Sequence, residues 1–199
     1  VNILINDPYF SPNGDGVKDF LVLYPQVPQT SGAQTWKLEV LDGKNIVQKT
    51  LGATGSIPRE ISLDGRDDRG KALPEGSYRA KFTVVYQNGS EPHALSPAFA
   101  LDITAPTANL NAKHTAFSPN GDGVLDTMDI DQKASEEWLW TGEIRRLGSS
   151  SSAAPTKTYS FEGEVPRLLQ WNGRNDQGAL APDGEYEYSM RATDRAGNV

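Results

Sequence analysis

The sequence predicts an all-β protein built from two tandem β-sandwich domains, and three observations support this. No stretch sustains an apolar period of 3.6 residues, whereas short alternating apolar runs are frequent. The 199 residues include 19 glycines and 13 prolines, which interrupt the chain as turns between short strands do. Two long blocks each occur twice, about 107 positions apart, and this indicates two copies of one domain.

The repeated blocks are the most specific of these observations. Phe10-Ser-Pro-Asn-Gly-Asp-Gly-Val-Lys-Asp19 recurs almost unchanged as Phe117-Ser-Pro-Asn-Gly-Asp-Gly-Val-Leu-Asp126. A second block, residues 55–70, matches residues 163–178. Each copy spans about 100 residues, which is enough for a modest hydrophobic core. We therefore predict an immunoglobulin-like repeat over residues 1–104 and a second one over residues 105–199.

Strand patterns in the first repeat follow one another at short intervals. Trp36, Leu38 and Val40 alternate with polar residues, as in a half-buried strand. Tyr78–Tyr86 is the clearest strand, and Asn88-Gly89 after it is a strong hairpin turn. Seven strands are expected in all, at residues 1–5, 20–24, 36–40, 46–50, 57–63, 78–86 and 98–103. Seven short strands in about 100 residues predict a sandwich of the immunoglobulin or fibronectin type.

The second repeat has the same pattern but stops earlier. Gly197 corresponds to Gly89, yet only Asn198 and Val199 follow it, whereas the first repeat continues into its last strand. We therefore expect the second repeat to lack this strand. Two explanations stay open: the chain is a piece that ends early, which we favour, or another chain donates the strand by edge addition.

Composition excludes several classes of protein. A net charge of −7 and a pI near 4.9 make nucleic acid an unexpected partner, because phosphate binding needs clustered Lys and Arg. There is no cysteine, so neither disulfides nor thiolate metal sites are available. No apolar run approaches the roughly 20 residues of a membrane span, and we expect no membrane insertion by this segment. The first residue is Val1, so we expect the chain to be part of a longer protein.

The repeated Asn-Gly-Asp-Gly string spaces its oxygen atoms as a calcium loop does. An EF-hand loop places ligands at positions 1, 3, 5, 7 and 9 and glycine at position 6. Counted from Ser11 and Ser118, the string puts Gly16 and Gly123 at position 6. The candidate calcium ligands are Asn13, Asp15, the Val17 carbonyl and Asp19 in the first copy, and Asn120, Asp122, the Val124 carbonyl and Asp126 in the second.

The departure from an EF-hand is equally clear. Position 12 holds Val22 in one copy and Asp129 in the other, so the bidentate glutamate is absent. With two carboxylates per loop, calcium affinity is expected to be weak, about millimolar. The alternative is a turn without metal, because Asn and Asp side chains accept hydrogen bonds from nearby backbone amides by themselves.

No enzyme signature is found, and we predict a protein without catalytic residues. His93 and His114, the only histidines, occupy positions that do not correspond in the two repeats, and no Gly-x-Ser-x-Gly motif is present. Trp138 and Trp140 offer a surface for stacking sugars or, more simply, belong to the core.

The order of the repeated motifs, followed by Asp194-Arg-Ala-Gly-Asn198, resembles that of FlgD-type immunoglobulin-like repeats. These repeats are named after the flagellar hook-capping protein and occur in large bacterial envelope or surface proteins, including those of spirochaetes. The resemblance spans both repeats. It implies an extracytoplasmic, non-enzymatic spacer or assembly module whose partners are other repeats or envelope proteins. The alternative is an adhesin that recognises a host protein or glycan through loops such as residues 149–155.

Overall fold

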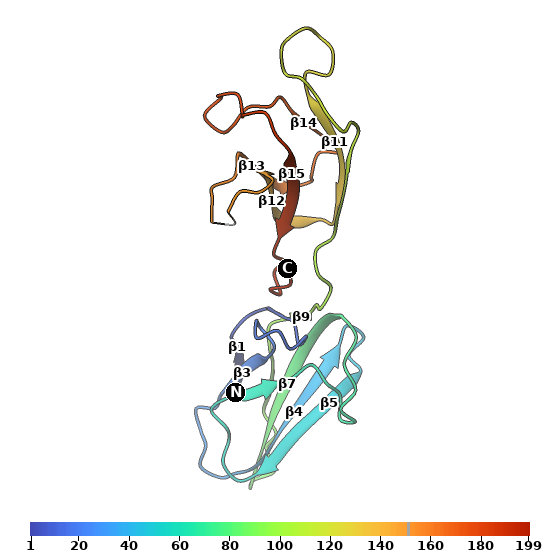
Figure 1. Cartoon of the computed structure of the whole chain (residues 1–199). Coiled ribbons are helices and arrows are strands. Elements are labelled where there is room, and N and C mark those ends of the chain that lie inside the picture. Colours follow the sequence, from blue (N-terminus) through green and yellow to red (C-terminus); the bar gives the residue numbers. More distant parts are fainter. Residues whose placement is uncertain (151) are drawn as a thin grey trace. The chain divides into compact units, whose positions relative to one another are not determined.

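The computed structural model describes residues 1–150 and 152–199, and the described part of the chain is all-β (Figure 1). Its backbone forms fifteen strands and no helix, so the predicted fold class is confirmed. The chain divides into two compact units. Unit 1 comprises Val1–Thr104 together with Arg195–Asn198, and unit 2 comprises Ala105–Asp194 together with Val199.

Unit 1 consists of two sheets. One sheet has the order β1-β3-β6, and its three strands pair antiparallel. The other has the order β2-β9-β7-β4-β5, with β8 paired to β7; here β2 runs parallel to β9. The strands are β1 (Asn2–Ile5), β2 (Tyr9–Phe10), β3 (Leu21–Gln26), β4 (Ala33–Asp42), β5 (Val47–Thr54), β6 (Ile61–Leu63), β7 (Gly76–Tyr86), β8 (His93–Leu95) and β9 (Phe99–Leu101).

The core of unit 1 follows from the alternation along its strands. In β3, Leu21 and Leu23 are buried and the residue between them is half-buried, as expected for a strand with one face on the core. Phe99 of β9 enters the same core and contacts two other rings. Its centroid lies 6.1 Å from that of Phe10 and 6.2 Å from that of Tyr78. The last strand of unit 1 is therefore part of its core.

Unit 2 also has two sheets, with the orders β10-β11-β14 and β13-β12-β15. Its strands are β10 (Ala108–Ala112), β11 (Met128–Ala134), β12 (Glu137–Arg146), β13 (Lys157–Gly163), β14 (Leu168–Trp171) and β15 (Tyr186–Ala192). In the part of the chain that the structure describes, β15 pairs only with β12, whereas the corresponding strand β7 pairs with β4, β8 and β9. Within the described residues no strand follows β15, so unit 2 shows no counterpart of β9.

A tyrosine near the start of one strand closes each sandwich in the same way. The Tyr78 hydroxyl donates to the Pro74 carbonyl at 2.6 Å, and the Tyr186 hydroxyl donates to the Pro182 carbonyl at 2.6 Å. A tyrosine that bonds back to the backbone a few residues upstream is a hallmark of immunoglobulin-type sandwiches. The repeated sequence Pro-(Glu/Asp)-Gly-x-Tyr therefore encodes this corner in both units.

Three strand expectations differ from the structure. β2 and β8 were not expected, and both are too short to show an alternating pattern. The strand expected at residues 57–63 is limited to Ile61–Leu63, because Pro58 has no N–H to donate to a neighbouring strand. No described helix is long and apolar enough to cross a membrane.

Candidate functional site

The Asn-Gly-Asp-Gly loop of unit 1 is held by hydrogen bonds between its own residues. The Asp19 carboxylate accepts from the Gly14 and Gly16 amides, at 2.7 and 2.9 Å. Asp15 accepts from the Val17 amide at 2.7 Å and from the Asn13 side-chain amide at 3.0 Å. The Asn13 side-chain oxygen accepts from the Asp15 amide at 2.9 Å. Every candidate ligand side chain of this loop thus bonds within the loop.

The loop of unit 2 repeats these bonds one for one. Asp126 accepts from the Gly121 and Gly123 amides at 2.7 and 2.8 Å, and Asp122 accepts from the Val124 amide at 2.8 Å. The Asn120 side chain donates to Asp122 at 2.9 Å. This bond, followed by that from Val124, lowers the pKa of Asp122 below its usual 3.8.

The backbone angles of the two loops agree as well. The φ angles of Gly14 and Gly121 are 85° and 81°, in the left-handed region that favours glycine. Lys18 and Leu125, which are not glycines, also have positive φ, at 50° and 51°. The conformation is therefore a property of the string itself, since it is the same in two units with different surroundings.

The hydrogen bonds within the loops limit how a calcium ion could be bound. The carboxylate oxygens of Asp15, Asp19, Asp122 and Asp126 all accept amide hydrogen bonds, so a cation would have to share each of these atoms. Among the described residues, no three His, Asp or Glu side chains are grouped closely enough to hold a metal ion. Weak calcium binding by the Asn, Asp and Val residues named above stays a prediction.

The loop of unit 1 also receives a segment from the other end of the chain. Asn198 is only 2% exposed, and its side-chain oxygen accepts from the Ser11 hydroxyl at 2.6 Å and from the Asn13 amide at 3.1 Å. Its side-chain nitrogen donates to the Asp102 carbonyl at 3.1 Å. Ala196 is fully buried beside it. Arg195–Asn198 therefore forms an integral part of unit 1.

Two further residues of unit 1 hold the start of this segment. The Arg195 guanidinium donates to the Tyr9 hydroxyl at 2.9 Å and lies over the Tyr9 ring, 5.5 Å from its centroid. The Lys18 ammonium donates to the Arg195 carbonyl at 2.7 Å and pairs with Asp7 at 3.0 Å. The sequence-based site did not include these contacts. The signal was the Asp194-Arg-Ala-Gly-Asn198 motif, which the first repeat does not contain.

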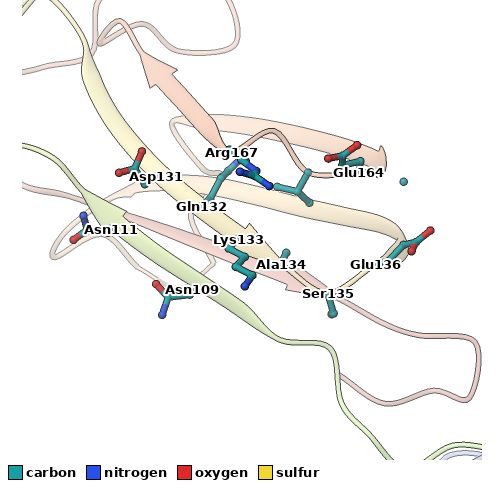
Figure 2. Close-up of a pocket in the computed structure, with 12 residues that line it drawn as sticks. Asn109, Asn111, Asp131, Gln132, Lys133, Ala134, Ser135, Glu136, Glu164 and Arg167 are labelled. Carbon is teal, nitrogen blue, oxygen red and sulfur yellow. The ribbon is translucent and has the colours of Figure 1, made fainter.

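Two hollows are lined by described residues of unit 2. The first, of about 720 Å³, has a polar and mixed-charge lining along β10, β11 and the segment before β14. Figure 2 shows Asn109 and Asn111 on β10, with Arg167 near Gln132 of β11. The buried side-chain nitrogen of Gln132 has no hydrogen-bond partner among the residues that the structure describes, while its oxygen accepts from the Tyr188 hydroxyl at 2.9 Å. Both acidic and basic side chains line this hollow. The hydroxyl of Ser135, which also lines it, donates to the Glu137 carboxylate at 2.9 Å and accepts from the Thr107 amide at 3.0 Å, so it joins two neighbouring backbone segments.

The second hollow, of about 710 Å³, lies between the two sheets of unit 2 and has a largely apolar lining. Phe117 and Tyr186 line it, and they correspond to Phe10 and Tyr78, the residues that Phe99 contacts in unit 1. This hollow is therefore the place that the last strand fills in unit 1.

The two tryptophans considered for sugar stacking have opposite environments. Trp140 is 2% exposed, and its indole N–H donates to the Ser135 carbonyl at 3.0 Å, so it belongs to the core. Trp138 is 72% exposed and lies at a bulge, where the pairing of β12 with β13 shifts between Glu137 and Leu139. A bulge redirects a side chain. A platform made of both rings is thus excluded, and Trp138 alone faces solvent.

No family model and no curated protein matches this chain. Solved structures do match. One is a tetra-tandem repeat in the extending region of a large adhesion protein, with 16% identity over 99% of this chain and 46% of that one, at a TM-score of 0.39. The fibronectin(III)-like modules of Clostridium thermocellum CbhA match with 16% identity over 98% and 87%, at 0.40.

A third similar structure concerns the host cell surface retention of a 1.5-MDa bacterial ice-binding adhesin. It shows 14% identity over 99% of this chain and 59% of that one, at a TM-score of 0.43. The chain thus spans about half the length of the two adhesin structures it matches. At these identities and TM-scores the likeness assigns no role to this chain, and its all-β fold follows from its own strand pairing. The narrower resemblance to FlgD-type repeats has no matching family model behind it.

Proposed function

We propose that the chain is a non-enzymatic spacer or assembly module of a bacterial surface protein, located outside the cytoplasm and flanked by other repeats. One observation carries this proposal. The most specific sequence motif of the chain occurs in both units as the same self-bonded turn, and its polar side chains are used to hold backbone. Duplicated residues with this role support an architectural function, since a reaction centre needs polar groups that converge on a substrate.

A replacement experiment in the parent protein tests this role. Residues 1–199 are exchanged for an unrelated pair of β-sandwich domains of equal length, and the distance of a distal epitope from the cell surface is measured. A spacer predicts that the distance and the surface function are retained. A shorter variant of the parent protein, with one sandwich in place of two, serves as the control and should bring the epitope closer. Loss of function at unchanged distance would contradict a spacer role and favour recognition.

Recognition of a host protein or glycan is the second candidate, and the exposure of Trp138 is the observation that favours it. Aromatic rings that face solvent are common in sugar and protein recognition. The loop at residues 149–155 was the other element of this hypothesis, and its Ser151 lies outside the described residues. Binding of the chain to cells or to a glycan array should fall with Trp138→Ala. Gln34→Ala is the matched control, because Gln34 is exposed at the corresponding position of β4, where the pairing of β4 with β7 shifts.

We further propose that calcium binds these loops weakly and raises the stability of both units. A ligand that binds only the folded state raises the melting temperature. Thermal melts with millimolar calcium and with chelator should therefore differ, and the difference should vanish in Asp15→Asn combined with Asp122→Asn. Equal melting temperatures in the native chain would eliminate calcium and leave the spacer role intact.

A further inference from the structure

The segment Arg195–Asn198 and the loop of unit 1 fit as a plug and a socket. We define the socket by Ser11, Asn13 and Val17, and the plug by Ala196, Gly197 and Asn198. The Asn198 oxygen receives hydrogen bonds from Ser11 and Asn13. Gly197 has a φ of 98°, and a Cβ placed on it would lie 2.6 Å from a methyl carbon of Val17. The contact therefore requires glycine before asparagine.

Unit 2 contains the same socket in the same conformation. Ser118, Asn120 and Val124 correspond to the three socket residues, and the hydrogen bonds of the surrounding loop match one for one. Ser118 is exposed, whereas Ser11 is fully buried, and within the described residues the Ser118 hydroxyl makes no hydrogen bond. Val124 is 66% exposed. The second socket is thus preformed, and its Ser118 hydroxyl is available to a partner.

We propose that the loop of unit 2 is an acceptor for an Ala-Gly-Asn segment supplied by a further repeat of the same kind. This inference rests on the proposed function, in which the chain is part of an array. The occupant follows from unit 1, where an identical loop binds that sequence. Because the loop has the same shape without its plug, binding carries no cost for ordering the socket.

The two sockets differ in what surrounds them, and this predicts a difference in selectivity. Tyr9 and Lys18, which hold Arg195 in unit 1, are replaced by Ala116 and Leu125 in unit 2. The second socket therefore lacks both side chains that hold Arg195 in unit 1. The Asp102 carbonyl, which accepts from Asn198, belongs to the segment after β9 and has no counterpart in unit 2. We expect the second socket to bind more weakly and to depend on glycine and asparagine alone.

The test uses the whole chain and the synthetic peptide Thr-Asp-Arg-Ala-Gly-Asn-Val, which is residues 193–199. Backbone amide signals are followed by NMR while the peptide is added. We expect the Gly121, Gly123 and Val124 signals to shift with a dissociation constant of about 1 mM, since a free peptide loses conformational freedom on binding. The Gly14 and Gly16 signals should stay unchanged, because the chain's own plug occupies that loop.

Three variants separate this contact from unspecific binding. Changing the asparagine of the peptide to alanine removes two hydrogen bonds and should weaken binding about tenfold or more. Changing its arginine to alanine should alter binding at unit 2 less than about twofold, since both side chains that hold Arg195 in unit 1 are lacking there. In the chain, Ser118→Ala should weaken binding, and a chain ending at Asp194 should show shifts in both loops.

Each result either supports or overturns the proposed binding of the peptide to the loop of unit 2. Shifts at unit 2 that need the asparagine support the proposal. Shifts confined to the loop of unit 1 in the shortened chain would overturn it, because the second socket would then be incompetent. Shifts in neither loop would also overturn it, because the plug would then have no affinity of its own. The epitope-distance experiment does not depend on any of these outcomes, so the spacer role is tested separately.

Discussion

Unit 1 and unit 2 share their tyrosine corners, their polar loops and the order of their first strands, but they differ in how the sandwich is closed. In unit 1, β9 pairs with β7 and places Phe99 between Phe10 and Tyr78. In unit 2 the corresponding place is an open hollow. Local sequence therefore sets the loops and corners, whereas burial depends on a strand from elsewhere in the chain.

A second difference is that the large side chain at one core position comes from different strands in the two units. The registers of β4 with β7 and of β12 with β15 align Leu38 with Gly142 and Ala80 with Tyr188. A Cβ on Gly142 would lie 2.5 Å from the Tyr188 hydroxyl oxygen, so the tyrosine side chain lies where the leucine would be. The sandwich keeps its packing because the large residue has moved to the neighbouring strand.

The largest difference in stability between the two units is expected when the corresponding residues Phe10 and Phe117 are replaced. Phe10→Ala should lower the unfolding free energy of unit 1 by about 3–5 kcal/mol, because the ring is buried on all sides. Phe117→Ala should cost roughly half of that, since Phe117 borders the open hollow. Urea titration followed by hydrogen exchange at β3 and β11 separates the two units. Equal losses would show that the hollow is closed in solution.

High pH should act mainly on unit 2. Burial, followed by the charge of Asp176, raises the pKa of Tyr159 to about 12, and burial followed by Tyr159 raises the pKa of Tyr188. The neutral phenols are favoured in the folded state. Their contribution to stability is therefore complete below about pH 10 and is lost as the pH rises toward about 12. Denaturation midpoints of unit 2 should fall over this range.

If ionisation of the phenols lowers the stability of unit 2 at high pH, the variant Tyr159→Phe should lose less stability than the native chain. Tyr78→Phe is the matched control in unit 1, where burial also raises the pKa of a tyrosine. A fall in the stability of unit 2 that is the same in both variants would assign the effect to other groups.

The loops should respond equally in the two units. Asp19→Ala and Asp126→Ala each remove a carboxylate that accepts two glycine amides. We expect each to cost about 1–3 kcal/mol in its own unit, because two exposed glycine amides lose a charged acceptor. Hydrogen exchange of the glycine amides checks this directly. A much larger cost in one unit would mean that the surroundings, and not the string, hold the loop.

The stabilities of the two units should differ only slightly in their response to acid. The Thr104 hydroxyl, and after it the Ile103 amide, lower the pKa of Glu75 below its usual 4.5. This contribution is present above about pH 4.5 and is lost as the pH falls through the lowered value. Glu75→Gln should make unit 1 slightly less stable at neutral pH and reduce its acid sensitivity, as denaturation midpoints would show. Asp183→Asn is the control in unit 2, where the corresponding carboxylate makes no such bond within the described residues.

Much of this architecture could be predicted from the sequence, because its signals are local. Turn residues, alternation in β4 and β7 and the repeated Pro-x-Gly-x-Tyr string are each read within a few positions. The plug could not be predicted, because Asn198 meets Ser11 across nearly the whole chain. The opposite environments of Trp138 and Trp140 also escaped prediction, since the bulge that separates them depends on the pairing of two strands.

The bond between Gly14 and Asp19 has a consequence for the chemical lifetime of the chain. An Asn-Gly step deamidates when the backbone nitrogen of the glycine attacks the side-chain carbonyl carbon of the asparagine and ammonia leaves. Here the nitrogens of Gly14 and Gly121 are held by carboxylates, and the oxygens of Asn13 and Asn120 are held by the next amide. Both steps should therefore deamidate slowly while folded and quickly in urea, as the masses of the peptides that contain Asn13 and Asn120 would show. Durability of this kind suits a protein that is not soon replaced.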